Sequence, residues 1–427
     1  MKPNLVISCP ATSRSGYGDH SRDLIRSLIK IDKYNIRILD QIWGNCPKNQ
    51  LGENDKDISS LIIPPSETGK LQQPDIWIQI TVPNEFQPIG KYNIGITAGI
   101  ETTNCHADWI LGCNRMDRVI VPSEHSKYVF KSMNYKGENP QTKEPMPDLT
   151  LDRPIDVLME GLDMEFFNKT NTIPKTIDST LNSIKEDFCF LFCGHWLNGG
   201  MGHDRKDVGM TIRVFLETFK DKAPKNMPAL ILKTSGAGFS LTEREDILRK
   251  IQQIRHSMGS NKALPNVYLL HGDLSKEELN GLYNHSKVKA MVSFTKGEGF
   301  GRPLLEFSVT GKPTIASNWS GHVDFLSAHG VMLPGKLNKV DPSVVWEKVI
   351  LEDSEWFTVD YGYAASILKD VHKQYKKYHE KSRKQTQYVK ENFTLDIMTE
   401  QFEEILNNIS SLFEVKLPKV EEMQTYE

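Results

Sequence analysis

The stretch that decides the fold is residues 289–316, which read KAMVSFTKGEGFGRPLLEFSVTGKPTIA. It opens with an apolar run at 289–293 that is typical of a buried strand. A glycine-rich turn follows, and Pro303 then suits the first turn of a helix. A second short apolar run, 314–316, comes directly after a Gly-Lys-Pro turn. The stretch therefore predicts a strand, a crossover helix and a second, parallel strand.

The same alternation of apolar runs and segments of helical period recurs through most of the chain, which predicts an α/β protein with parallel sheets. The polar segment 168–187 interrupts it and is the best domain boundary. We predict an N-terminal Rossmann-like domain (1–170), a C-terminal Rossmann-like domain (171–390), and a last helix with a tail (391–427). The other predicted strands are 5–9, 36–39, 76–80, 93–97, 118–121, 155–159, 188–193, 230–233, 267–270 and 331–333.

Composition limits the kinds of partner. Of the 427 residues, 52 are Lys or Arg and 55 are Asp or Glu, so the formal charge is 52 − 55 = −3. A near-neutral chain supplies no long-range field for nucleic acid or an anionic membrane, so an anion site has to be local. The six cysteines are too few for a disulfide scaffold. We predict a soluble, cytoplasmic protein with no nucleic-acid partner and no transmembrane segment.

The glycine-rich turn 297–301 carries the chemistry. Glycines let the backbone approach a ligand closely, and unpaired N–H groups at a helix start favour an anion such as a diphosphate. Glu298 precedes the helix and Glu306 follows in its first turns. Ionised carboxylates accept hydrogen bonds from sugar hydroxyls. The alternative is a plain strand-to-helix turn in which Glu306 only supports the helix dipole.

Residues 298–326, EGFGRPLLEFSVTGKPTIASNWSGHVDFL, resemble the signature of the family 4 glycosyltransferases (glycosyl transferases group 1), which have the GT-B fold. Two glutamates at fixed spacing, a Gly-Lys-Pro turn into a strand and a glycine turn before an acidic residue carry the resemblance. Other segments are similar to the family in the same order: SGYG at 15–18, VIVPSEHSKYVF at 119–130, MEGLDMEFF at 159–167, HDRKDVGMTIRVF at 203–215 and HGDLSKEELNGLY at 271–283.

The resemblance implies two facing Rossmann-like domains, with the C-terminal helices crossing back to brace the first. It implies that Glu306 binds the ribose hydroxyls of a nucleotide and that Glu298 lies near the transferred sugar. Lys206 is implied as the cation that neutralises the leaving diphosphate. Backbone contacts to the donor are implied for Gly299, Phe300 and Gly301 in the second domain and for Gly16 and Gly18 in the first.

The sequence departs from the family at two places. An arginine usually follows the glycine that ends the strand corresponding to 188–193, and here that position is His195. The charge role of the arginine falls to Arg205 or to Lys233. No segment aligns with the family's acceptor-side histidine. The nearest polar candidates on the acceptor side are Glu101, His106 and Asp108.

The implied function is transfer of a sugar from a nucleoside diphosphate sugar to a hydroxyl-bearing acceptor with retention of configuration. A lysine and helix N-termini would stabilise the diphosphate, so no metal ion is obligatory and no cofactor is needed beyond the donor. The alternatives are a sugar-nucleotide epimerase or a phosphorylase of the same fold, and a GT-B protein that binds nucleotides or glycans without catalysis.

From about residue 354 onward the sequence predicts helix only. An apolar stripe there runs beside a row of cationic residues, Lys373, Lys376, Lys377, Lys381, Arg383 and Lys384. A basic helix of this kind is compatible with nucleic-acid binding. The solvated face of an amphipathic helix is the commoner interpretation in a chain of neutral charge.

Overall fold

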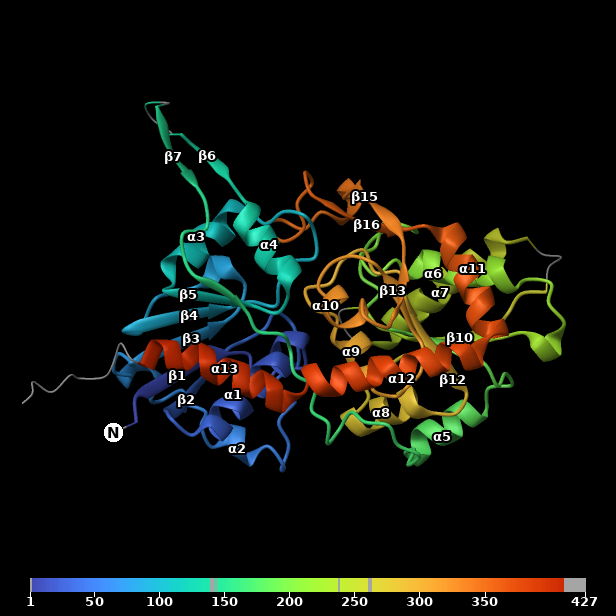
Figure 1. Cartoon of the computed structure of the whole chain (residues 1–427), viewed down its shortest axis with the longest axis horizontal. Helices are drawn as coiled ribbons and strands as arrows, with labels where there is room; N and C mark the ends of the chain where they lie inside the picture. The colour runs from blue at the N-terminus through green and yellow to red at the C-terminus, as the bar shows by residue number, and fades with distance from the viewer. Residues whose placement is uncertain (1, 139–141, 143, 237–238, 260–262, 411–427) are drawn as a thin grey trace, which may run out of the picture.

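The structure is a computed structural model that describes residues 2–138, 142, 144–236, 239–259 and 263–410. Two six-stranded sheets with their helices lie side by side along the long axis of the molecule (Figure 1). The predicted α/β fold with two facing domains is confirmed. Each predicted strand corresponds to a strand of one of these sheets, within one or two residues at either end.

The first sheet has the strand order β2-β1-β3-β4-β5-β8, and its pairs are all parallel. Its strands are near-continuous apolar runs because helices cover both faces. Helix α1 (Gly16–Ile31) buries Leu24, Ile25 and Leu28 against the sheet. The domain contains β1 (Asn4–Cys9), β2 (Asn35–Asp40), α2 (Lys56–Ser59), η1 (Thr68–Lys70), β3 (Ile76–Ile80), η2 (Pro83–Glu85), β4 (Tyr92–Ile96), α3 (Ala107–Arg115), β5 (Arg118–Val121), α4 (Glu124–Ser132) and β8 (Ile155–Val157).

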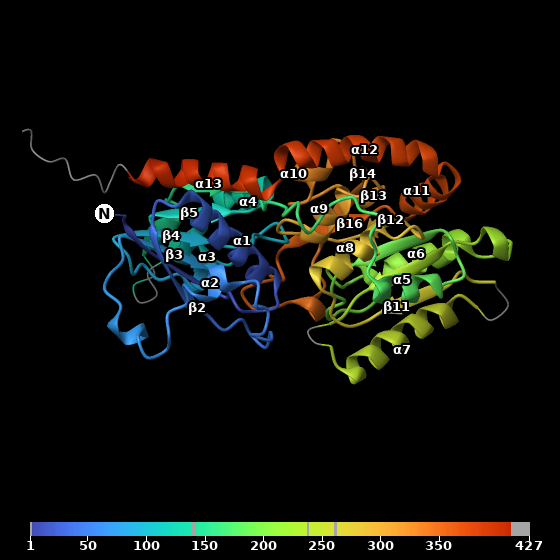
Figure 2. The same cartoon turned by 90° about the horizontal axis from the view of Figure 1, so that it is seen from below.

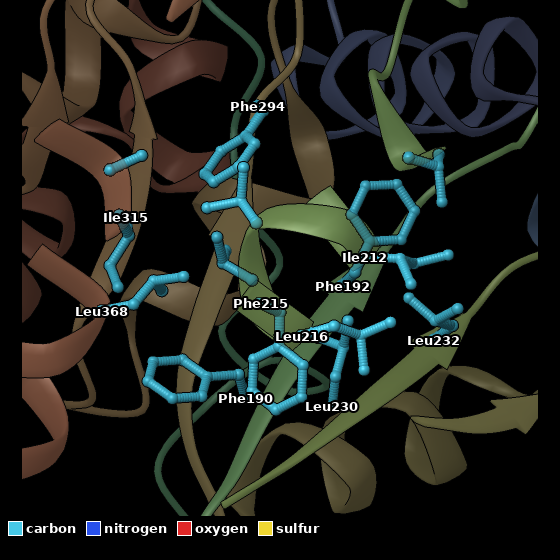
Figure 3. Close-up of a cluster of buried hydrophobic side chains, with 14 of the residues drawn as sticks. Phe190, Phe192, Ile212, Phe215, Leu216, Leu230, Leu232, Phe294, Ile315 and Leu368 are labelled. Carbon is cyan, nitrogen blue, oxygen red and sulfur yellow. The ribbon is translucent and has the colours of Figure 1, made fainter. Parts of the chain in front are cut away.

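The second sheet has the order β11-β10-β9-β12-β13-β14 and is also parallel. Phe190 and Phe192 of the central strand β9 pack with Phe215 of the helix above it in a fully buried aromatic core (Figure 3). The domain contains α5 (Lys175–Asn182), β9 (Cys189–Cys193), α6 (Val208–Phe219), η3 (Pro224–Asn226), β10 (Ala229–Lys233), α7 (Leu241–Ser257), β11 (Val267–Leu270), α8 (Lys276–Asn284), β12 (Val288–Ser293), α9 (Arg302–Ser308), β13 (Thr314–Ser317), α10 (Val323–Leu326) and β14 (Val331–Leu333).

Three helices close the chain, namely α11 (Tyr361–Lys373), α12 (Tyr375–Asn392) and α13 (Leu395–Ser410). Helices α12 and α13 run nearly end to end along one side of both domains (Figures 1 and 2). Met398, Phe402 and Leu406 of α13 enter the core of the first domain, and the Thr399 hydroxyl lies 2.8 Å from that of Ser27. The predicted return of the last helix is therefore confirmed. The tail 411–427 lies outside the described residues.

Two antiparallel hairpins lie outside the sheets. One, β6 (Tyr135–Glu138) with β7 (Pro145–Leu149), projects from the first domain as an arm (Figure 1). The other pairs β15 (Gly335–Lys339) with β16 (Glu355–Val359), with η4 (Pro342–Val344) between them. The prediction of helix only from residue 354 is wrong at β16. Trp356 and Val359 of that strand are buried, so tertiary packing of its apolar side chains decides its conformation.

Candidate active site

Arg205 and Lys206 lie in the loop before α6, and buried charges fix that loop. The next residue, Asp207, has a left-handed backbone with φ of 51°. Its carboxylate accepts a 2.6 Å hydrogen bond from the Tyr361 hydroxyl and lies 3.5 Å from the Lys296 ammonium. Both Asp207 and Lys296 are fully buried. The basic pair is thus attached to the core of the second domain rather than carried by a free loop.

Glu298 lies between these two cations. Its carboxylate pairs with the Lys206 ammonium, and its second oxygen lies 3.4 Å from the Arg205 guanidinium. Arg205 also donates a 2.9 Å hydrogen bond to the Gly297 carbonyl. Burial alone would raise the pKa of Glu298, but the charges of Lys206 and Arg205 outweigh burial and lower this pKa to about 2. Glu298 is therefore an ionised hydrogen-bond acceptor at neutral pH.

The first domain contributes Glu101 to the same cluster. Its carboxylate lies 2.8 Å from the Arg205 guanidinium, so Arg205 bridges the two domains. Burial raises the pKa of Glu101, and the neighbouring charge of Glu298 acts in the same direction. Of the three acceptor-side candidates, Glu101 alone has a recorded contact with this cluster in the described part of the chain.

The other two acceptor-side candidates stand at the start of α3. The His106 ring nitrogen Nδ1 accepts a hydrogen bond from the Asp108 backbone N–H at 3.1 Å and so caps the helix. The Asp108 carboxylate lies 2.9 Å from the Lys348 ammonium, in the segment between β15 and β16. These contacts join the domains at their periphery.

The glycine-rich turn 297–301 packs directly on the first domain. A Cβ atom at Gly297 would lie 1.9 Å from the Glu101 carbonyl oxygen, and one at Gly299 would lie 2.0 Å from the Ala98 carbonyl oxygen. Gly301 has a φ of 99°, which favours glycine. The Phe300 side chain points away from the turn into the core of the second domain. The glycines therefore permit close contact between two backbones.

Glu306 belongs to a second interdomain cluster, around Arg302. The Arg302 guanidinium lies 2.6 Å from Asp23 and 3.2 Å from Glu160, both of the first domain, and 3.3 Å from Glu306. The Tyr283 hydroxyl donates a 3.1 Å hydrogen bond to Glu306. Burial raises the pKa of Glu306 to about 7, although the charge of Arg302 opposes this.

Lys233 and His195 lie close to Lys206, and Lys233 adds a further cation. Burial lowers the pKa of His195, and the charges of Lys206, Arg205 and Lys233 lower it further, so these groups share one region at the ends of β9 and β10. The Lys233 ammonium donates a 2.8 Å hydrogen bond to the Gly272 carbonyl. The His195 ring lies 3.3 Å from the Ser235 hydroxyl. Arg205 and Lys233, the two alternatives for the missing arginine's role, thus both lie near His195, the residue that replaces it.

The segment 14–18 of the first domain, at the start of α1, also contacts the second domain. Ser15 caps α1 by accepting a 3.0 Å hydrogen bond from the Gly18 N–H. A Cβ atom at Gly18 would lie 2.3 Å from the Ser13 carbonyl oxygen, whereas Gly16 has open space around it. Arg14 forms an ion pair with Asp273 of the second domain. Gly16 and Gly18 therefore lie in the first turn of α1, and Arg14, just before that turn, contacts the second domain.

Sequence reasoning missed Arg302, Asp23 and Glu160. Arg302 stands inside the quoted motif, so its position was visible, but its partners are distant in the sequence.

Across the described residues, no group of three His, Cys, Asp or Glu side chains gathers as a metal site would require. Within the same part of the chain, every helix is too short or too polar to cross a membrane.

The buried carboxyl of Glu306 should make stability depend on pH. Its folded pKa of about 7 lies above the usual value of 4.5, so the protonated form favours folding. That contribution is complete below about pH 4.5 and is lost as the pH rises through 7. Glutamine stays neutral, so the stability of Glu306→Gln relative to wild type should rise between pH 4.5 and 7 and stay higher above pH 7. Urea unfolding across pH measures it. An equal gain in Glu245→Gln, an exposed control, would contradict the assignment.

The two Rossmann-like domains and the helices that return to the first of them are the features of the GT-B fold. Comparison of the sequence with protein-family models and with curated proteins gives no match. Among solved structures, the chain is similar to a glycosyltransferase from Rickettsia africae, with 15% identity, a TM-score of 0.61, and coverage of 96% of this chain and 99% of that one. The chain is also similar to sucrose-phosphate synthase from Thermosynechococcus elongatus, with 12% identity, a TM-score of 0.62, and coverage of 96% of this chain and 100% of that one. It is similar as well to Anabaena HepE in complex with UDP-glucose, with 11% identity, a TM-score of 0.59, and coverage of 95% of this chain and 100% of that one.

Proposed function

We propose that this chain is a glycosyltransferase that moves a sugar from a nucleoside diphosphate sugar to a hydroxyl acceptor with retention of configuration. The observation that carries the proposal is the cluster of Lys206, Arg205 and Glu298 at the junction of two Rossmann-like domains. A solved structure with this fold contains UDP-glucose, which supports a donor of the same class.

The charges of the cluster favour a diphosphate. Lys206 and Arg205 are balanced by Glu298 and Glu101, so these four groups sum to zero. Lys233 adds a cation without a carboxylate partner among the described residues, and its ammonium contacts only a backbone carbonyl. A diphosphate bound here would be attracted by Lys233, and by Arg205 once Glu101 no longer pairs with it. In this proposal Glu306, on α9, accepts hydrogen bonds from the ribose hydroxyls, and Glu298 accepts them from the hydroxyls of the transferred sugar.

In the proposed reaction the acceptor oxygen bonds to the anomeric carbon on the face that the diphosphate leaves. The bond from that carbon to the phosphate oxygen breaks, and its electron pair stays on the diphosphate. The hydroxyl proton passes to the same phosphate oxygen. Lys206 and Arg205 stabilise the charge that grows there, and the ionised Glu298 accepts hydrogen bonds from the sugar.

A panel of nucleoside diphosphate sugars tests the proposal. Binding of the true donor should raise the melting temperature, since a ligand of the folded state stabilises it by mass action. With an acceptor sugar, the reaction should release free nucleoside diphosphate, and NMR should show the donor's anomeric configuration in the product. Release of a sugar phosphate would instead indicate a phosphorylase. Binding without turnover across a broad acceptor panel would favour a protein that binds nucleotides without catalysis.

The reaction should not need a divalent cation. In the proposed reaction Lys206 and Arg205 neutralise the diphosphate, so turnover should survive excess EDTA. The measurement is the initial rate with and without chelator, followed by addition of Mg²⁺ or Mn²⁺. A rate that disappears in EDTA and returns with either ion would assign the leaving-group stabilisation to a metal instead.

A further inference from the structure

The outer face of α12 carries a dense row of cations that the proposed reaction does not use. Helix α12 contains two acidic residues, Glu380 and Glu391, and Lys373 at the end of α11 joins six exposed cationic residues of α12 to make seven: Lys373, Lys376, Lys377, Lys381, Arg383, Lys384 and Lys390. No carboxylate of the described residues forms an ion pair with any of the seven. In a chain with a formal charge of −3, this face is a strong local exception.

Further cations lie beside α12 on neighbouring elements, and one of them, Lys312, donates hydrogen bonds to the Tyr283 and His285 carbonyls. Lys169 and Lys312 lie within electrostatic reach of His379 together with Arg383. Burial, with the charges of Lys289 and Lys169, lowers the pKa of Lys312 to about 7. On the acidic side, Glu380 acts on His379, and Asp370 is hydrogen-bonded to Tyr378. Positive charge clearly exceeds negative charge here, and such repulsion is relieved when an anionic surface covers it.

This face is long. Helix α12 has 18 residues, so it is about 27 Å long, and it lies along the outer edge of the molecule (Figure 2). At its start, where α11 ends, is a hollow of about 490 Å³ lined by three of the lysines with Gln374, Tyr375 and Glu380. A row of lysines beside a shallow hollow matches a plane of phosphate headgroups.

We propose that α12 docks the protein peripherally on an anionic lipid membrane. Single-stranded nucleic acid fits this face less well, because it needs exposed aromatic rings for base stacking. The ring of Tyr375 packs edge-on against Phe188, and the hydroxyl of Tyr378 is bound to Asp370. Lysines near an anionic bilayer need no such rings, since each contributes through charge alone. Membrane docking of α12 is independent of the sugar-transfer reaction.

Cosedimentation with vesicles tests the proposal on the full chain. Vesicles of phosphatidylcholine mixed with phosphatidylglycerol should bind the protein, and vesicles of phosphatidylcholine alone should not. Replacing Lys376, Lys377 and Lys384 together with glutamine should lower the partition coefficient roughly 100-fold, at about fivefold per lysine. Glutamine keeps the helix propensity of lysine, so α12 stays intact. Added salt should release the wild-type protein, because it screens surface charge.

The matched control replaces Lys56, Lys70 and Lys131 with glutamine, which changes the net charge equally at exposed positions of the first domain. This variant should bind anionic vesicles as the wild type does. Equal losses in both triple variants would overturn the proposal in favour of unspecific charge attraction. Binding of wild type to a mixed-sequence single-stranded RNA, with no binding to either vesicle, would overturn it in favour of a nucleic-acid partner.

Discussion

Replacing Lys206 with alanine should lower turnover about 100-fold or more while donor affinity changes far less. The reason is that charge on the departing diphosphate grows as the sugar–phosphate bond breaks, so the ammonium stabilises the transition state more than the bound donor. Loss of one preorganised donor to a developing oxyanion has an effect of this size. The measurements are kcat by product release and the donor Kd by calorimetry.

Three further variants sharpen that result. Arg205→Ala and Lys233→Ala test which residue supplies the second cation, since the one that does should also lose more turnover than affinity. Lys225→Ala removes an exposed lysine of η3, ahead of the start of β10, whose end Lys233 marks, and should leave both quantities unchanged. A folded Lys206→Ala protein with wild-type kcat would remove Lys206 from the reaction and the diphosphate from this loop.

The strands of both sheets were predictable because they are buried on both faces. Runs such as Ile76–Ile80 and Cys189–Cys193 are apolar at nearly every position, and turns rich in glycine or polar residues punctuate them. The returning helix was expected from the family resemblance rather than from its own pattern. The two hairpins were missed because β7 and β15 are mostly exposed and none of β6, β7 and β15 has a continuous apolar run, so the local sequence did not indicate a buried strand.

The part of the candidate site that the second domain contributes was predictable from the sequence, whereas its contacts with the first domain were not. The motif residues Glu298 and Glu306 and the basic pair lie in segments with recognisable spacing. Glu101 was named as an acceptor-side candidate, but its pairing with Arg205 was not predicted, and Asp23 and Glu160 were missed, because these contacts form only once the domains are packed together. Contacts of this kind depend on domain placement, which no local pattern encodes.

The glycines of residues 297–301 illustrate the same point. Their sequence indicates close approach of the backbone to something, and a phosphate is the usual candidate. In the structure the close neighbours of Gly297 and Gly299 are carbonyl groups of residues 98–101. Helix α9 has only seven residues, so the side-chain cations, and not this helix terminus, carry most of the positive charge at the site.

Replacing Arg302 with methionine should lower the free energy of unfolding by about 3–5 kcal/mol, because it leaves Asp23, Glu160 and Glu306 buried without their cation. The loss should shrink at acid pH, where the orphaned carboxylates bind protons. Arg302→Lys should recover part of it, since one ammonium cannot replace a planar fork that reaches three carboxylates. Urea unfolding at two pH values measures both effects. A methionine variant as stable as wild type at pH 8 would show that Arg302 does not hold the domains together.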